Sequence, residues 1–128
     1  MPTKDQFDEL FRECYWVWTD SYKGSNTSGF IAFKAKNAKV KGVKVFSSDV
    51  KSTRYDECSD THIFFPASGG CVDDILDGAN CDGHYWACTL DVSAPDRAYY
   101  LDFKYKTVFY VMSIDRFVGF PIRPVRNK

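Results

Sequence analysis

The sequence predicts a single α+β domain in which one N-terminal helix precedes an antiparallel sheet of short strands. Apolar residues first recur at helical spacing and then, after about residue 14, alternate with the period of a strand. The strand-like runs are short and are separated by Gly, Pro, Asn and Asp, which is typical of antiparallel sheets. Because the chain has 128 residues, no internal repeat and no low-complexity linker, we expect residues 1–128 to form one domain.

The helix is expected over residues 4–14. Thr3 and Gln6 have the spacing of a capping box, in which each side chain reaches the free backbone N–H of the other residue. Acidic residues in the first turns suit the helix dipole. Apolar side chains then follow on one face, at Phe7, Leu10, Phe11 and Cys14.

The remaining elements are expected to be short strands joined by loops. The strands are expected at residues 15–19, 30–35, 42–47, 61–70, 85–90, 98–103, 107–111 and 120–125. The second and third of these strands are expected to pair with each other. Residues 47–60 are polar and are expected to form a surface loop, residues 72–76 to contain one helical turn, and residues 91–96 to form a loop.

Alternation within residues 98–103 assigns side chains to the two faces of that strand. One set is expected to point into the core: Tyr99, Leu101 and Phe103. The next set is expected to lie on the exposed face: Tyr100, Asp102 and Lys104.

Composition and charge exclude several classes of partner. Lys plus Arg equals Asp plus Glu, at 17 each, whereas a nucleic-acid-binding domain shows a clustered basic excess. No run of about 18 apolar residues is present, so no membrane insertion is expected. The N-terminus lacks the features of a signal peptide, so an exported form is either a mature fragment or uses another route, such as assembly into a particle. Aromatic residues make up 17% of the chain, and Tyr and Trp are favoured at contact surfaces.

The five cysteines raise the possibility of a metal site or a reactive thiol. Cys81, His84 and Cys88, with Cys71 upstream, have residue types that zinc binds, but structural zinc sites normally use two well-spaced ligand pairs. The simpler interpretation is that Cys71 and Cys81 are free or disulfide-bonded. No residue in a recognisable motif orients a Cys–His pair for nucleophilic chemistry. We therefore expect no metal, no cofactor and no catalytic residue, with a Cys/His metal-dependent enzyme as the alternative.

Five sequence blocks carry a resemblance to a known family. In order they are MPTKDQFDELFRECYWVWT, IFFPASG, GHYWACTL, RAYYLDF and RFVGFPIRPVR. Together they resemble the Fibrobacter succinogenes major paralogous domain, which is common in Bacteroidetes and their phages, and they span nearly the whole chain apart from residues 36–60. The resemblance implies a C-type lectin-like fold, with the two termini tied together and the ligand surface on long loops and short strands of the C-terminal half.

Some members of this superfamily are variable proteins of diversity-generating retroelements, whose adenine-specific mutagenesis scatters residue types over the C-terminal part. The positions that such relatives keep fixed match Tyr85, Trp86, Ala98, Tyr99, Leu101, Phe103, Arg116, Gly119 and Phe120. The resemblance implies that the positions between them are hypervariable and bind ligand. These are His84, Asp91, Val92, Asp96, Arg97, Tyr100, Asp102, Tyr105, Phe109, Val111, Ile114, Asp115 and Val118.

The resemblance implies a non-enzymatic binding protein that displays variable side chains to a ligand. The chain would be a receptor- or adhesin-like protein of a phage particle or bacterial cell surface, and its partner a protein or other cell-surface ligand. The alternative within binding is an undiversified surface paralogue with a fixed partner. The sequence motifs of calcium-dependent lectins are absent, so a lectin-like fold implies neither calcium nor carbohydrate.

The stretch 109–120, FYVMSIDRFVGF, is unusually apolar and is expected to combine scaffold with contact surface. The scaffold set is Tyr110, Arg116, Gly119 and Phe120. The displayed set is Phe109, Val111, Met112, Ile114, Asp115 and Val118. The alternative is that Tyr110, Phe117 and Phe120 are core while Asp115 and Arg116 form a turn.

Overall fold

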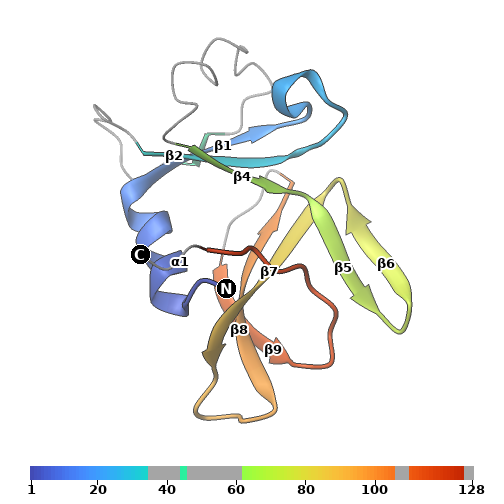
Figure 1. Ribbon diagram of the computed structural model, residues 1–128. Coiled ribbons are helices and arrows are strands. Elements are labelled where there is room, and N and C mark those ends of the chain that lie inside the picture. The colour runs from blue at the N-terminus through green and yellow to red at the C-terminus, as the bar shows by residue number, and fades with distance from the viewer. Residues whose placement is uncertain (35–43, 46–61, 106–109, 126–128) are drawn as a thin grey trace.

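The computed structural model describes residues 1–34, 44–45, 62–105 and 110–125, and confirms an α+β architecture of one helix and two sheets (Figure 1). The expected loop 47–60 lies outside the described residues. A short 3₁₀ turn spans Tyr22–Gly24. The elements are α1 (Lys4–Glu13), β1 (Cys14–Thr19), β2 (Gly29–Lys34), β3 (Lys44–Val45), β4 (His62–Pro66), β5 (Ser68–Val72), β6 (Ile75–Ala79), β7 (Asp82–Leu90), β8 (Arg97–Lys104) and β9 (Tyr110–Asp115).

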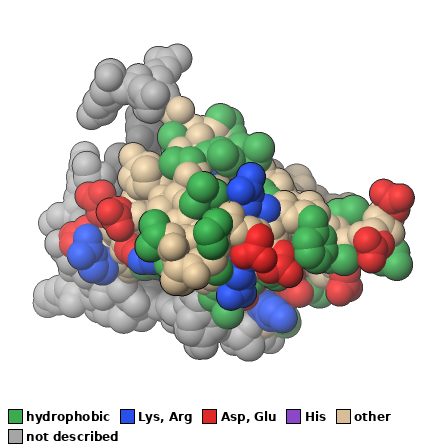
Figure 2. Space-filling model, turned by 90° about the horizontal axis from the view of Figure 1, so that it is seen from below, with side chains coloured by type: hydrophobic (Ala, Val, Ile, Leu, Met, Phe, Trp, Pro, Cys, Tyr) green, Lys and Arg blue, Asp and Glu red, His purple; other side chains and the backbone are tan. Residues whose placement is uncertain are grey.

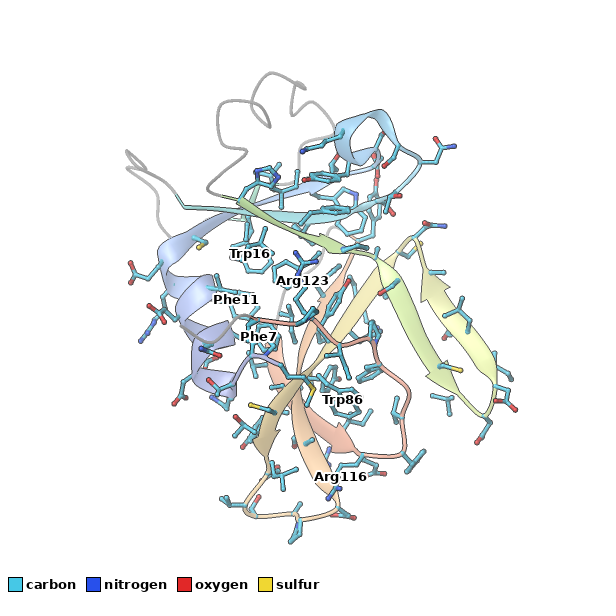
Figure 3. The ribbon with its side chains drawn as sticks, viewed as in Figure 1. Phe7, Phe11, Trp16, Trp86, Arg116 and Arg123 are labelled. Carbon is cyan, nitrogen blue, oxygen red and sulfur yellow. The ribbon has the colours of Figure 1, made fainter. Side chains whose placement is uncertain are left out.

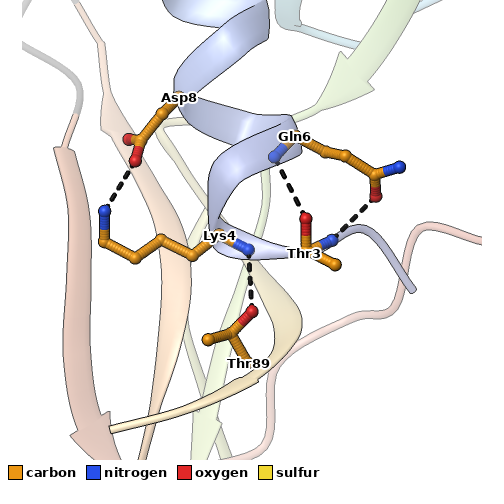
Figure 4. A network of polar contacts seen from close by, with 5 residues as sticks. All are labelled: Thr3, Lys4, Gln6, Asp8 and Thr89. Atoms are coloured by element: carbon orange, nitrogen blue, oxygen red, sulfur yellow. Dashed lines mark hydrogen bonds and ion pairs between the residues drawn. The ribbon is translucent and has the colours of Figure 1, made fainter.

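Helix α1 forms at the expected place and with the expected cap (Figure 4). Gln6 N donates to Thr3 Oγ1 at 3.1 Å, and Thr3 N donates to Gln6 Oε1 at 2.9 Å. Lys4 N donates to Thr89 Oγ1 of β7 at 3.0 Å, so the first turn of the helix is also fastened to the second sheet. Lys4 Nζ binds Asp8 Oδ2 at 2.6 Å, and this hydrogen bond raises the pKa of Lys4.

The first sheet has the order β3-β1-β2-β4. Strand β1 pairs antiparallel with β2 and parallel with β3. The expected pairing of residues 30–35 with 42–47 is therefore wrong, because β1 lies between them. Trp16, Val17 and Trp18 are all buried, and a strand that is buried on both faces takes a central position in a sheet.

The second sheet has the order β6-β5-β7-β8-β9. The single strand expected at 61–70 divides at Ala67 into β4 and β5, which belong to different sheets.

The helical turn expected at 72–76 is wrong. Val72 instead pairs with Ile75 across a two-residue hairpin turn, whose Asp73 and Asp74 have φ of 48° and 63°. Left-handed φ at both central positions is the geometry of a tight β-hairpin and is incompatible with a right-handed helix.

The core lies between the two sheets and α1. Trp16 of β1 stacks on Phe65 of β4, with ring centroids 5.4 Å apart, and Phe7 reaches the same core from the helix (Figure 3). Leu101 and Phe103 of β8 are fully buried, and Tyr99 packs against the cluster. The core-facing set expected for this strand is confirmed.

The C-terminal segment 116–125 is not the strand expected at 120–125; it fills a gap in the second sheet (Figure 1). Strands β5 and β7 pair only at Gly69 and Gly83. Beyond that point, Gly119 exchanges two backbone hydrogen bonds with Cys71 of β5, both 2.8 Å long. Trp86 N of β7 donates to the carbonyl oxygen of Pro121 at 3.2 Å. One short segment thus bridges both strands and covers the outer face of the sheet.

Candidate binding surface

The outer face of β7 and β8 carries an aromatic cluster beneath the C-terminal segment. The Phe120 ring stacks on His84 with centroids 4.7 Å apart, and lies 4.9 Å from Trp86 and 4.8 Å from Tyr100. Tyr100 is only 7% exposed. The expectation that Tyr100 lies on an exposed face is wrong, because the returning chain covers that face. Burial raises the pKa of Tyr100, and the nearby carboxylate of Asp102 raises it further.

His84 and Asp102 face each other across β7 and β8. Their Nδ1 and Oδ1 atoms are 2.9 Å apart, although neither atom has a hydrogen-bond partner. Their side chains are only 16% and 13% exposed. Both residues are on the predicted ligand-binding list, and the structure brings them together under Phe120, with little open surface.

Asp91 joins the loop between β7 and β8 to strand β9. Its Oδ1 accepts from Ser93 Oγ at 2.6 Å and from Ser93 N at 3.0 Å, and its Oδ2 accepts from Ser113 Oγ at 2.7 Å. The hydrogen bonds from the Ser93 and Ser113 side chains lower the pKa of Asp91, because they stabilise the charged carboxylate. Asp91 is buried, which contradicts the expectation that its side chain is exposed to a ligand.

Two arginines fasten the end of β9, one to the start of β8 and the other to the same loop. Arg97 donates to the Ser113 carbonyl at 2.6 Å through Nη2, and its Nε lies 3.7 Å from Asp115 Oδ1. Arg116 donates through its backbone N–H to the Asp96 carbonyl at 3.0 Å and through Nη1 to the Pro95 carbonyl at 3.3 Å. The loop and the strand end therefore form one hydrogen-bonded unit.

An open hollow of about 480 Å³ lies at this end of the sheet, lined by Asp96, Asp115, Arg116 and Phe117. A turn closed by Val118 N donating to the Asp115 carbonyl carries Arg116 and Phe117 at its tip. Phe117 is 77% exposed, so its expected alternative role in the core is wrong. Seen from this end, acidic and basic side chains lie beside one another among apolar ones (Figure 2).

The other predicted contact residues differ in exposure. Val92 is 97% exposed and Tyr105 is 40% exposed, although the Tyr105 ring also contacts Trp18. Ile114 is half-buried, and Val118 is 7% exposed. Phe109 lies outside the described residues.

The expected division of 109–120 into an inward scaffold and an outward contact set is wrong. Val111 packs against the core and Val118 is buried, whereas Arg116 and Phe117 point outward. The alternation of β9 ends at Asp115, where a turn begins, so strand periodicity does not extend to the later residues. The signal that identifies Phe117 is the turn at Asp115 and Arg116, since side chains at the tip of a surface turn are exposed.

The four described cysteines differ in their environments, and Cys71, Cys81 and Cys88 are free thiols. Cys14 is buried and Cys71 is half-buried on β5, while Cys81 and Cys88 are exposed. Within the described ranges, no three His, Cys, Asp or Glu side chains are grouped so as to hold a metal ion.

Comparisons with protein-family models, with curated proteins and with solved structures gave no match. In the described part of the chain, the helix is too short and too polar to cross a membrane.

Proposed function

We propose that this protein is a non-enzymatic, receptor- or adhesin-like binding protein whose contact surface is the hollow at the end of β9 and the loop beside it. The observation that carries the proposal is Phe117. A large aromatic ring that is 77% exposed at the tip of a turn contributes little to folding. Exposed aromatic side chains next to charged groups are typical anchors of protein contacts.

The groups around Phe117 support recognition of a specific partner. Asp96 and Arg116 line the same hollow, and neither forms an ion pair with another described residue. Opposite charges at a rim set the orientation of a partner and discriminate against wrong ones.

The support beneath this surface is a set of hydrogen bonds within the chain. Asp91, Ser113 and Arg97 hold the loop and the strand end in one arrangement before any partner arrives. A preorganised surface loses less conformational entropy on binding than a mobile one.

The fold proposed for this scaffold is C-type lectin-like. The five resembling sequence blocks support it, as does the mixed architecture of one helix and two sheets. The C-terminal segment also returns between β5 and β7, close to strands that contact the first residues of the chain: Cys88 N donates to the Pro2 carbonyl at 2.9 Å.

The proposed source of specificity is retroelement diversification of this surface, in a phage particle or at a bacterial cell surface. Exposed or half-exposed members of the predicted set suit such variation, because a new side chain there leaves the core unchanged. They are Val92, Asp96, Tyr105, Ile114 and Asp115, whereas the half-buried Arg97 belongs with the supporting residues because it donates to the Ser113 carbonyl. The buried members Asp91, Tyr100 and Val118 suit a supporting role.

The experiment that tests diversification is sequencing of the gene's neighbourhood and of sibling genes. We expect a reverse transcriptase gene, a template repeat matching the codons of the C-terminal part, and substitutions concentrated at the exposed positions. A locus without reverse transcriptase or repeat, with siblings varying evenly over the chain, would refute diversification. It would leave an undiversified binding domain with a fixed partner.

A further inference from the structure

We infer that the β5–β6 hairpin is a second contact surface, which binds a protein that presents apolar side chains edged by Lys and Arg. The hairpin runs from Ser68 to Ala79 and projects from the body of the molecule (Figure 1). The inference goes beyond the proposed function and is independent of it, because none of the predicted ligand-binding residues lies in this hairpin. It is carried by the placement of the hairpin, by its exposed apolar side chains and by its charge.

Hydrogen bonds attach the base of the hairpin to the rest of the fold. Asn80 N donates to the Ala67 carbonyl at 2.7 Å, which joins the two ends of the hairpin. Cys71 of β5 exchanges two backbone hydrogen bonds of 2.8 Å with Gly119 of the C-terminal segment. Beyond Cys71, all residues from 72 to 77 are exposed, and within the described ranges their backbone pairing is with each other. The base therefore holds this projecting end away from the body.

The projecting end carries three large apolar side chains, distributed over both faces of the two-stranded ribbon. Val72 is 46% exposed, Ile75 is 68% exposed and Leu76 is 63% exposed. Val72 and Ile75 are cross-strand partners and share one face, whereas Leu76, which pairs with Cys71, lies on the other. Single exposed apolar side chains are common on protein surfaces, but a group of them on one projecting hairpin is typical of an interaction site.

The charge of the hairpin is acidic throughout. Asp73 and Asp74 form the tip, and Asp77 lies on β6. The ion pairs between described side chains do not involve these three carboxylates. The sequence has no Lys or Arg between residues 62 and 96, so no neighbouring basic residue in the chain offsets them. Figure 2 shows acidic and apolar side chains together at this projecting end, on the right of the view.

These two features together select the class of partner. Apolar side chains on the hairpin require apolar side chains opposite them, and the carboxylates beside them require cations at the edge of the contact. A protein surface that combines Leu-type side chains with Lys or Arg supplies both. Nucleic acid and anionic lipid surfaces present phosphates, which the acidic tip repels.

The test uses the ¹⁵N-labelled full chain and an amphipathic helical peptide, acetyl-(Leu-Lys-Lys-Leu-Leu-Lys-Leu)₂-amide, whose apolar face is edged by lysine. We expect amide shift changes confined to residues 70–79 during titration. A second peptide with Glu in place of every Lys keeps the apolar face and reverses the charge. It is expected not to bind, because its carboxylates face those of the hairpin.

One pair of variants measures the apolar contribution. Ile75→Ala/Leu76→Ala is expected to weaken binding of the lysine peptide about tenfold, because it removes the side chains that the peptide covers. Leu90→Ala is the matched control, since Leu90 is a 50% exposed apolar residue outside the hairpin, and it is expected to bind as the parent protein does.

A second pair measures the charge contribution. Asp73→Asn/Asp74→Asn is expected to weaken binding about tenfold, while Asn, which also adopts left-handed φ, retains the turn. Asp5→Asn/Glu9→Gln removes two exposed charges from α1 instead and is expected to leave binding unchanged.

Several results would overturn the inference. They are equal binding of the two peptides, shift changes centred outside the hairpin, no binding of the lysine peptide, or equal losses in the test and control variants. A dimer that forms with increasing concentration in light scattering, and that Ile75→Ala/Leu76→Ala abolishes, would assign the hairpin to a second copy of the chain. None of these results bears on the proposed contact surface at the end of β9.

Discussion

Gly70 of β5 lies against the ring of Phe120: a Cβ built on Gly70 would lie 2.7 Å from Phe120 Cε1 and 3.3 Å from Cδ2 of His84. The first distance is shorter than real Cβ contacts allow. The glycine is therefore required by the close approach of the C-terminal segment. Its absence of a side chain lets Phe120 stack on His84 and close the outer face of the sheet.

Gly70→Ala is expected to displace Phe120 and to lower the free energy of unfolding by about 1–3 kcal/mol, the usual cost of overpacking. Urea denaturation followed by tryptophan fluorescence measures the loss. The double variant Gly70→Ala/Phe120→Ala provides the control, because the alanine at position 70 is expected to cost much less once the ring is gone. Equal costs in both backgrounds would contradict a clash with Phe120.

Tyr100→Ala is expected to lower the free energy of unfolding by about 3 kcal/mol, because it leaves a cavity between Trp86 and Phe120. Ile75→Ala, which removes an exposed apolar side chain from β6, is expected to change it by less than about 0.5 kcal/mol. Chemical denaturation of both variants makes the comparison. If the Tyr100→Ala and Ile75→Ala proteins are equally stable, the Tyr100 side chain is exposed and belongs to the contact surface.

The contribution of Asp91 to stability is expected to depend on pH. Its pKa in the folded protein is below the ordinary value of 3.8, so the folded state favours the charged form. The resulting stabilisation is present above pH 3.8 and is lost as the pH falls through the lowered pKa. The difference in unfolding free energy between the parent protein and Asp91→Asn should therefore be largest near neutral pH and shrink below 3.8. Asp74→Asn at the hairpin turn controls for loss of one charge, and a difference that persists unchanged in acid would contradict the prediction.

Thr3→Ala is expected to lower the free energy of unfolding by about 1 kcal/mol, because it removes the hydroxyl that caps α1. Thr3→Ser keeps the hydroxyl and is expected to be nearly neutral. Thermal unfolding by circular dichroism measures both variants. If Ser and Ala at this position cost the same, the cap does not contribute to stability.

The parts of the fold that sequence predicts well are those specified locally. The capping residues Thr3 and Gln6 and the apolar spacing behind them lie within one segment, so the helix follows from its own residues. The positions of most strands follow from alternation in the same way. The pairing of β3 with β1 does not, because it joins residues that are far apart in the chain and depends on which strand is buried on both faces.

The site is less predictable than the fold for the same reason. Alternation correctly separates Tyr100 from Leu101, but it does not reveal that Phe120 returns to cover Tyr100. Asp91 similarly has the residue type of a surface ligand contact, and only the position of Ser113 on a distant strand makes it a support. The periodicity of a strand cannot predict that a segment distant in the sequence covers one of its faces. Asp96 and Asp115, by contrast, line the hollow, as expected for displayed residues.

Phe117 and Phe120 are three residues apart and are expected to respond oppositely to truncation. Phe117→Ala removes an exposed ring and should change the free energy of unfolding by less than about 0.5 kcal/mol. Phe120→Ala removes the ring that packs on His84, Trp86 and Tyr100, and should cost about 2 kcal/mol, less than a fully buried Phe because it is partly exposed. Urea denaturation gives both values. A stable Phe120→Ala protein beside a destabilised Phe117→Ala protein would reverse the assignment, making Phe117 a core residue and removing the anchor of the proposed contact surface.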